Sequence, residues 1–174
     1  MLSKDSPKIF QNNMPGNVCF GCGRETKDGL HVKSFWDGDE SVCFWKPKQF
    51  HQGWKDIMNG GIISTIIDCH TMGTAMAYAY KFEKRELSSK PHYRYATGTI
   101  KVRFIKPTPN KEVKLRAVVK SYTPKKVLIK CYVESNNKVT AEAEVVAFRV
   151  FDSSNTSKNL IRYHEVDIVM MLIG

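Results

Sequence analysis

One acidic residue lies inside an apolar segment that two glycines open, a combination that could stabilise and attack a reacting carbonyl group. The segment reads NGGIISTIID, so Asn59, Gly60 and Gly61 stand where the apolar run begins and Asp68 lies within it. The first backbone amides of a helix lack partners inside the helix, and the helix dipole makes this end positive. Glycine lets another molecule approach those amides closely, and asparagine caps helices well. The amides of Gly60 and Gly61 are therefore candidate donors to a developing oxyanion.

On a helix, Asp68 and Gly60 of one chain cannot serve the same carbonyl. They are eight positions apart, about 12 Å along the axis, whereas a nucleophile and an oxyanion donor must both lie within about 3 Å of one group. Asp68 could meet the Gly60 of a second copy if two helices ran antiparallel across a two-fold axis, the commonest symmetry of homo-oligomers. Two simpler explanations stay open: a capped helix start where glycines permit tight packing, and a buried acid satisfied by Ser64, Thr65 or Thr71.

The elements that would position these residues follow from the hydrophobic pattern. Aromatic segments flank DGDE, residues 37–40, and predict a β-hairpin. From Asn59 to about Phe82, apolar residues recur at spacings of three and four and cover nearly all faces, which predicts one long buried helix. The second half alternates with period two between turns at TPNK, TPKK and SNNK, which predicts three or four strands in an antiparallel meander. A single apolar helix must then be wrapped by the sheet.

Length and composition favour one globular domain. The 174 residues are 42% apolar, and no run approaches the roughly 18 uncharged residues of a membrane span. We expect a flexible N-terminal arm over residues 1–16, one domain over residues 17–151 and a C-terminal tail over residues 152–174. Because the start of the sequence has no apolar run of the signal-peptide type, we expect a cytoplasmic protein that does not bind membranes.

The chain is basic, with a net charge of +10. Such a charge favours nucleic acid, an anionic membrane or a phosphorylated ligand without choosing among them. Basic strands with aromatic residues make a nucleic-acid-binding module one alternative function. No recognition motif pairs glycines with aromatic residues in the required pattern, so we do not expect nucleic acid to be the partner.

Five cysteines, an odd number, fit reduced thiols better than a disulfide framework. Cys19 and Cys22 form a C-x-x-C pair that could begin a zinc site, but a structural zinc site needs four ligands and usually a second close pair. A thioredoxin-like function would need a strand before this pair and a helix after it. A glycine-rich hairpin follows instead, so we do not expect that function. His70 follows Cys69, but adjacent helix residues point about 100° apart, so we expect no Cys–His dyad. We expect neither a bound metal nor a cofactor.

Three motifs occur in an order that resembles a known family. They read CFGCG over residues 19–23, HQGWKDIMNGGIISTIIDC over residues 51–69 and TGTIKVRFIKP over residues 97–107. Together they resemble hotdog-fold acyl-CoA thioesterases of the PaaI-like, phenylacetate-pathway type over roughly residues 17–150. The resemblance implies an α+β hotdog fold, in which an antiparallel β-sheet wraps around one long buried central helix. It also implies a homodimer, or a dimer of dimers.

The resemblance implies roles for particular residues. The Gly60 amide, helped by Gly61, would polarise a thioester carbonyl, and Asp68 of the other chain would act as nucleophile or general base. Thr97 would line the site and hold the attacking water. The implied reaction is hydrolysis of an acyl-CoA to the free acid and CoA, with CoA as part of the substrate and not a cofactor.

The same resemblance suggests substrate contacts and shows one departure. The residues expected to contact the substrate, including cations for the CoA phosphates, are His51, Gln52, Gly53, Trp54, Arg103 and Lys106. The family motif carries a histidine where this chain has Asn59, which can cap the helix and donate a hydrogen bond but cannot take up a proton. A non-catalytic hotdog protein that binds an acyl group or CoA is therefore an alternative.

Overall fold

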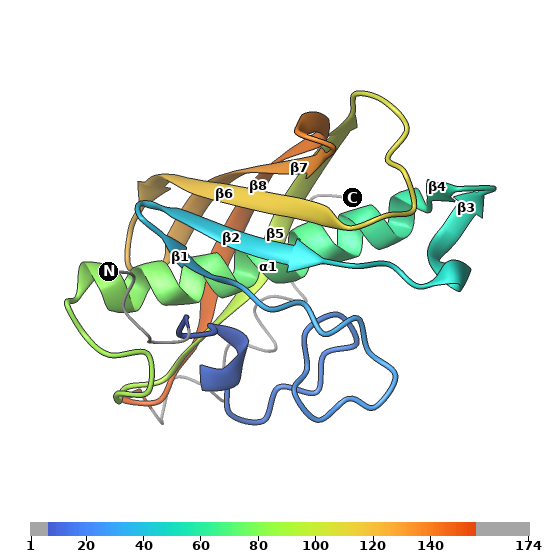
Figure 1. Cartoon of the computed structure of the whole chain (residues 1–174). Coiled ribbons are helices and arrows are strands. Elements are labelled where there is room, and N and C mark those ends of the chain that lie inside the picture. Colours follow the sequence, from blue (N-terminus) through green and yellow to red (C-terminus); the bar gives the residue numbers. More distant parts are fainter. Residues whose placement is uncertain (1–6, 156–174) are drawn as a thin grey trace, which may run out of the picture.

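The predicted apolar helix forms, and it organises the rest of the fold (Figure 1). In the computed structural model, which describes residues 7–155, helix α1 spans Gly60–Phe82 with Asn59 as its N-cap. Buried side chains occur on every turn from Ile63 to Tyr80. They are covered on one side by the sheet and on the other by the chain segment before residue 35. This two-sided cover explains why the helix carries no polar face.

The main sheet is antiparallel and has six strands in the order β1-β2-β6-β7-β8-β5. Its strands are β1 Phe35–Asp37, β2 Glu40–Trp45, β5 Tyr93–Phe104, β6 Val113–Tyr122, β7 Lys126–Ser135 and β8 Lys138–Asp152. The hairpin predicted around DGDE is the pair β1 and β2. A separate two-stranded ribbon precedes the helix, formed by β3 Gln52–Trp54 and β4 Ile57–Met58. Two short 3-10 helices complete the described elements, η1 Gln11–Asn13 and η2 Gln49–His51.

The predicted meander holds only for β6, β7 and β8. Strand β5 pairs with β8 at the far edge of the sheet, and the neighbour of β6 is β2 instead. The segment after β5 crosses the start of the helix, where the Met58 amide donates to the Thr108 carbonyl at 2.9 Å. This crossing places β5 and the β1–β2 hairpin at opposite edges, so that the sheet curves around α1. Alternation of apolar and polar residues identifies a strand but not its partner.

The core lies between α1 and the concave face of the sheet. Residues of β7 are buried at every second position, among them Val127 and Ile129, and they meet Ile66 and Ile67 of the helix in one cluster. Burying one such side chain contributes about 1.5–3 kcal/mol. The largely buried helix therefore has a fixed rotation, and each of its buried residues has a fixed environment.

The N-terminal segment belongs to the fold from residue 7 onward and is not the flexible arm that was expected there. Phe10 is fully buried and packs on Trp36 with ring centroids 5.1 Å apart. The Gln11 side chain donates to Ser34 Oγ at 3.1 Å and accepts from the Ser34 amide at 2.7 Å. Single long-range contacts of this kind leave no periodic signal in the sequence. Of the predicted C-terminal tail, residues 156–174 lie outside the described residues.

Among the described helices, none has the length and apolar character needed to cross a membrane.

The side chain of His70, a residue of α1, is fully buried and lies against two serine hydroxyls. Its Nδ1 lies 2.8 Å from Ser34 Oγ, and its Nε2 lies 3.4 Å from Ser41 Oγ. Burial lowers the pKa of His70 to about 3, so the ring is neutral at ordinary pH. Its neighbour Cys69 contacts Cys19 instead, so the two adjacent side chains have different surroundings.

We predict that the protein loses stability as the pH falls below about 6.5. The unfolded chain takes up a proton at the ordinary His70 pKa of 6.5, whereas the folded state takes it up only near pH 3. Between these values the unfolded state binds more protons, so the free energy of unfolding should fall by up to about 1.4 kcal/mol per pH unit. Above this window the His70 contribution should be constant. Urea denaturation across the range measures the slope.

The matched variant is His70→Gln, which keeps hydrogen-bonding capacity for the two serines but does not titrate. Its free energy of unfolding should lack this part of the slope. Equal slopes in the wild type and the variant would contradict the assignment to His70.

Candidate functional site

The Asp68 carboxylate is held by Thr97, which was expected to line the site and to hold the attacking water. Thr97 Oγ1 donates a hydrogen bond to Asp68 Oδ1. The three hydroxyls that the sequence offered as simpler partners, those of Ser64, Thr65 and Thr71, donate to backbone carbonyls of α1 at 2.9 to 3.0 Å. The carboxylate is therefore not an acid satisfied by its own helix. It is half-buried and turned toward β5.

A β-bulge in β5 turns Thr97 toward α1. Between Thr97 and Thr99, β5 advances by two residues while its partner strand β8 advances by one, so Gly98 is the extra residue. Thr97 and Val102, five positions apart, therefore both point to the helix side of the sheet. A Cβ atom added at Gly98 would lie 2.3 Å from the Phe148 ring, so only glycine fits here without a shift. In TGTIKVRFIKP, Thr97 and the next apolar residue, Ile100, are three positions apart, and this odd spacing is the signal that could have predicted the bulge.

Asp68 and Thr97 line a cavity of about 610 Å³ between α1, the start of β5 and the N-terminal segment. Cavities that hold small molecules in proteins are usually about 300–1,000 Å³. The apolar part of the wall includes Val18, Met72, Met76, Tyr93, Tyr95 and Phe151. The cavity can therefore enclose an apolar group beside a carboxylate.

Two polar side chains on the cavity wall were not identified from the sequence, because neither belongs to a recognisable motif. His92 Nδ1 is buried and has no hydrogen-bond partner among the described residues. Burial raises the pKa of Tyr95, so its hydroxyl stays protonated. Leaving a buried polar atom unpaired costs about 1–3 kcal/mol, and a ligand that bonds to His92 would remove that cost.

The start of α1 forms a second group of residues, separate from the cavity. Asn59 Oδ1 accepts from the amides of Gly61 and Ile62, at 2.8 and 3.3 Å. None of the described residues accepts a hydrogen bond from the Gly60 amide, and Gly60 lies against the ring of Phe104. The amide that was predicted to polarise a carbonyl is therefore free to do so.

Two of the predicted substrate contacts shape the loop before the helix. The His51 ring is buried, its Nδ1 accepts from the Lys48 amide at 2.9 Å, and its carbonyl accepts from the Asn59 amide at 2.9 Å. Burial lowers the pKa of His51, and nearby Lys48 adds to this effect. Gln52 Oε1 accepts from the Asp56 amide at 2.5 Å. The two side chains thus brace the loop, and the His51 backbone carbonyl holds the Asn59 amide.

The remaining predicted contacts are exposed at the same end of the molecule. Gly53 lies beside Asn59, and Trp54 is 82% exposed. Arg103 pairs with Glu142 at 2.5 Å. Lys106 is exposed and forms no ion pair within residues 7–155. The structure thus brings residues 51–54, 59–61 and 103–106 together, but not with Asp68 and Thr97 in the same chain.

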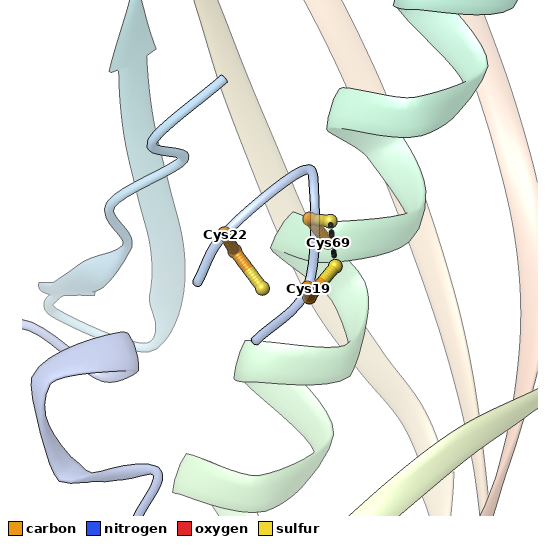
Figure 2. Close-up of side chains that lie close together, drawn as sticks. All are labelled: Cys19, Cys22 and Cys69. Carbon is orange, nitrogen blue, oxygen red and sulfur yellow. Dashed lines mark hydrogen bonds between the residues drawn. The ribbon is translucent and has the colours of Figure 1, made fainter. Parts of the chain in front are cut away.

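The C-x-x-C loop lies on the cavity wall and meets a third cysteine from α1 (Figure 2). The Sγ atoms of Cys19, Cys22 and Cys69 all lie within 4.8 Å of one another, and those of Cys19 and Cys69 are 3.7 Å apart. Spacing alone did not reveal this cluster, because 46 positions separate Cys22 from Cys69 and only the folded chain turns Cys69 toward the loop.

No family model matches the sequence, and no curated protein matches it either. Solved structures do match. A thioesterase superfamily protein from Shewanella loihica PV-4 is 26% identical, with a TM-score of 0.58 over 76% of this chain and 93% of that one. The PaaI protein of the E. coli phenylacetic acid degradation operon is 10% identical, with a TM-score of 0.57 over 71% of this chain and 82% of that one. A Streptococcus mutans UA159 protein solved bound to acetyl-CoA is 9% identical, with a TM-score of 0.58 over 74% of this chain and 96% of that one.

These neighbours confirm the predicted architecture. The fold is the α+β hotdog fold, with one long helix packed against an antiparallel sheet. The Shewanella neighbour also confirms the resemblance to thioesterase-superfamily proteins.

Removing the Asn59 cap should lower the free energy of unfolding by about 1 kcal/mol. In Asn59→Ala the amides of Gly61 and Ile62 lose the oxygen that accepts from them. Asn59→Asp keeps an acceptor at this position and should retain most of the stability. Chemical denaturation of the three proteins measures the difference, and an Asn59→Ala variant as stable as the wild type would show that the cap contributes nothing.

Proposed function

We propose that the protein is an acyl-CoA thioesterase, which hydrolyses the thioester of an acyl-CoA to the free acid and CoA. The observation that carries the proposal is the Asp68–Thr97 pair on the wall of a cavity of about 610 Å³. The hotdog fold shared with thioesterase-superfamily proteins supports this reaction class. The neighbour solved with acetyl-CoA supports CoA thioesters as the ligand class.

A complete site requires two copies of the chain. The cavity wall includes Asp68 and Thr97 but none of Asn59, Gly60 or Gly61. Antiparallel helices across a two-fold axis would place the partner subunit's Gly60 opposite Asp68 and create two equal sites. Such a homodimer, or a dimer of dimers, is the assembly we propose.

The exposed edge of the sheet supports this assembly. Strand β5 is the last strand of the sheet, so its outer backbone groups have no neighbouring strand among the described residues. Exposed apolar side chains lie along this end of the sheet: Ile100, Phe104 and Ile105 are 36, 52 and 46% exposed. An unpaired edge with apolar side chains is a template for pairing with a second chain.

In the proposed reaction, the free Gly60 amide of the partner subunit donates to the thioester oxygen while negative charge develops on it. Asp68 either attacks the carbonyl carbon, forming an anhydride that water then hydrolyses, or takes a proton from the water that attacks. Both routes break the C–S bond, release CoA as its thiol and leave the acid. Thr97 bonds Oδ1 and so leaves Oδ2 to react.

Asn59 would hold the oxyanion donor in place without transferring a proton. Its side chain occupies the amides of Gly61 and Ile62, which leaves only the Gly60 amide for a carbonyl. Because Asn59 does not titrate, a non-catalytic protein that binds acyl groups or CoA is the second candidate function. A thiol-release assay over short, long and aromatic acyl-CoAs separates the two, since only the enzyme produces free CoA.

The cations for CoA would lie at the helix-start end of the molecule. Lys106 is exposed and unpaired within the described residues, and it lies two positions after Phe104, which contacts Gly60. Arg103 shares its charge with Glu142 and is the weaker candidate. A lysine here would act as a point charge for a phosphate.

Asp68→Asn should lower turnover by at least about 10²-fold, because it removes the nucleophile or general base while nearly keeping shape. Acyl-CoA binding should change little, since the cavity and the amide donors remain. Thiol release and equilibrium binding measure the two quantities. Asp39→Asn, which changes an exposed carboxylate outside the cavity, is the control and should leave turnover unchanged. A loss of stability with only a modest loss of rate would mean that Asp68 is structural.

Mixing two inactive variants tests the shared site. Asp68→Asn and Gly60→Val each disable both sites of their own dimer, but a heterodimer of the two has one intact site. With random re-pairing, half of the dimers are mixed, so about one quarter of wild-type activity should return. Subunit exchange is followed by sedimentation and by mass spectrometry of tagged chains. Demonstrated exchange without recovery, or a fully active monomer, would show that the cross-subunit assignment is wrong.

A further inference from the structure

We infer that Cys19, Cys22 and Cys69 form a metal site and that the ion it takes is Zn²⁺. The three Sγ atoms lie within 4.8 Å of one another on the cavity wall, two from the C-x-x-C loop and one from α1 (Figure 2). Three thiols held this close offer a donor set that suits a thiophilic ion. The inference does not rest on the proposed thioesterase activity.

The sulfur spacing fits tetrahedral coordination. A Zn–S bond is about 2.3 Å long, so two sulfurs of a tetrahedral site are about 3.8 Å apart. The Sγ atoms of Cys19 and Cys69 are 3.7 Å apart, and both lie within 4.8 Å of Cys22 Sγ. A movement of about 1 Å in one side chain would complete a three-thiolate site. The fourth position would face the cavity and take water, as in zinc sites with three protein ligands.

The loop is shaped around the third sulfur. A Cβ atom added at Gly21 would lie 2.2 Å from Cys69 Sγ, so any other residue would push the loop away from α1. A Cβ atom added at Gly23 would lie 2.6 Å from the Cys19 carbonyl oxygen, to which the Gly23 amide donates at 2.7 Å. Both glycines of CFGCG are therefore needed to wrap this loop around the Cys69 side chain.

Hydrogen-bond donors surround the sulfurs and favour the thiolate form that metal binding requires. The Gly21 amide donates to Cys19 Sγ at 3.3 Å, and Asn17 Nδ2 donates to Cys22 Sγ at 3.4 Å.

The other two cysteines show what an ordinary buried thiol looks like in this fold. Cys43 and Cys131 are fully buried in the core, and neither belongs to a group of three metal-ligating side chains within residues 7–155. Burial raises the pKa of both thiols, that of Cys43 to about 12. Either one serves as a matched control for replacing a buried cysteine outside the cluster.

The test uses the full chain, purified in reductant and stripped of metal, to which ZnCl₂ is added. We expect one zinc ion per chain by mass spectrometry of the metal after gel filtration. Competition with a chromophoric chelator should show at least about tenfold weaker affinity in Cys19→Ala, Cys22→Ala and Cys69→Ala. Cys131→Ala should bind as the wild type does. Cobalt in place of zinc should show the thiolate charge-transfer absorption, which Cys19→Ala should lose.

Cys19→Ala is the decisive variant, because Cys19 is exposed on the loop and its replacement leaves the core intact. Zinc should raise the melting temperature of the wild type and of Cys131→Ala, but not that of Cys19→Ala. Unchanged zinc affinity in folded Cys19→Ala would overturn the inference. So would reduced wild-type protein that binds no zinc.

No acyl-CoA enters these measurements, so the two proposals can fail separately. Absence of zinc binding would leave the thioester hydrolysis proposal standing, and absence of thiol release would leave the zinc site standing.

Discussion

The burial of a helix that is apolar on nearly every face is the constraint on which the rest of the structure depends. Such a helix must be covered on both sides, here by the curved sheet and by the N-terminal segment. Enclosure fixes its rotation, and three consecutive residues then meet three different environments. Asp68 reaches Thr97, Cys69 reaches the C-x-x-C loop, and His70 enters the serine-lined core. The rotation of α1 about its own axis therefore sets the surroundings of all three side chains.

The sequence predicted correctly those structural features that depend only on residues close together in the chain. The helix over Gly60–Phe82, its Asn59 cap and the hairpin around DGDE each follow from spacing and capping chemistry within a few residues. The motifs placed Thr97 in one candidate site with Asp68, and in the fold Thr97 Oγ1 donates to Asp68 Oδ1. Three features depended on distant contacts and were not predicted: the place of β5 beside β8, the packing of Phe10, and the approach of Cys69 to Cys19. A period in the sequence cannot report which distant element completes a contact.

The start and the middle of α1 carry the two parts of the proposed chemistry. The start of the helix presents a free amide, and the middle presents a carboxylate that opens into a cavity. The rigid rise of the helix keeps these parts about 12 Å apart, so no change of side-chain rotamer can bring them together in one chain. Association of two copies is then the simplest way to join them. The helix that keeps the two groups apart in one chain would also position them in the dimer.

The bulge at Gly98 has an evolutionary consequence. It shifts the in-and-out alternation of β5 side chains by one position. Before the bulge the odd-numbered Tyr95 and Thr97 face the cavity, and after it the even-numbered Val102 faces the core. Substitutions that reshape the cavity wall therefore fall before the glycine, and those that change the packing of β5 on the core fall after it. Selection can alter the cavity without disturbing that packing, provided that the glycine is kept.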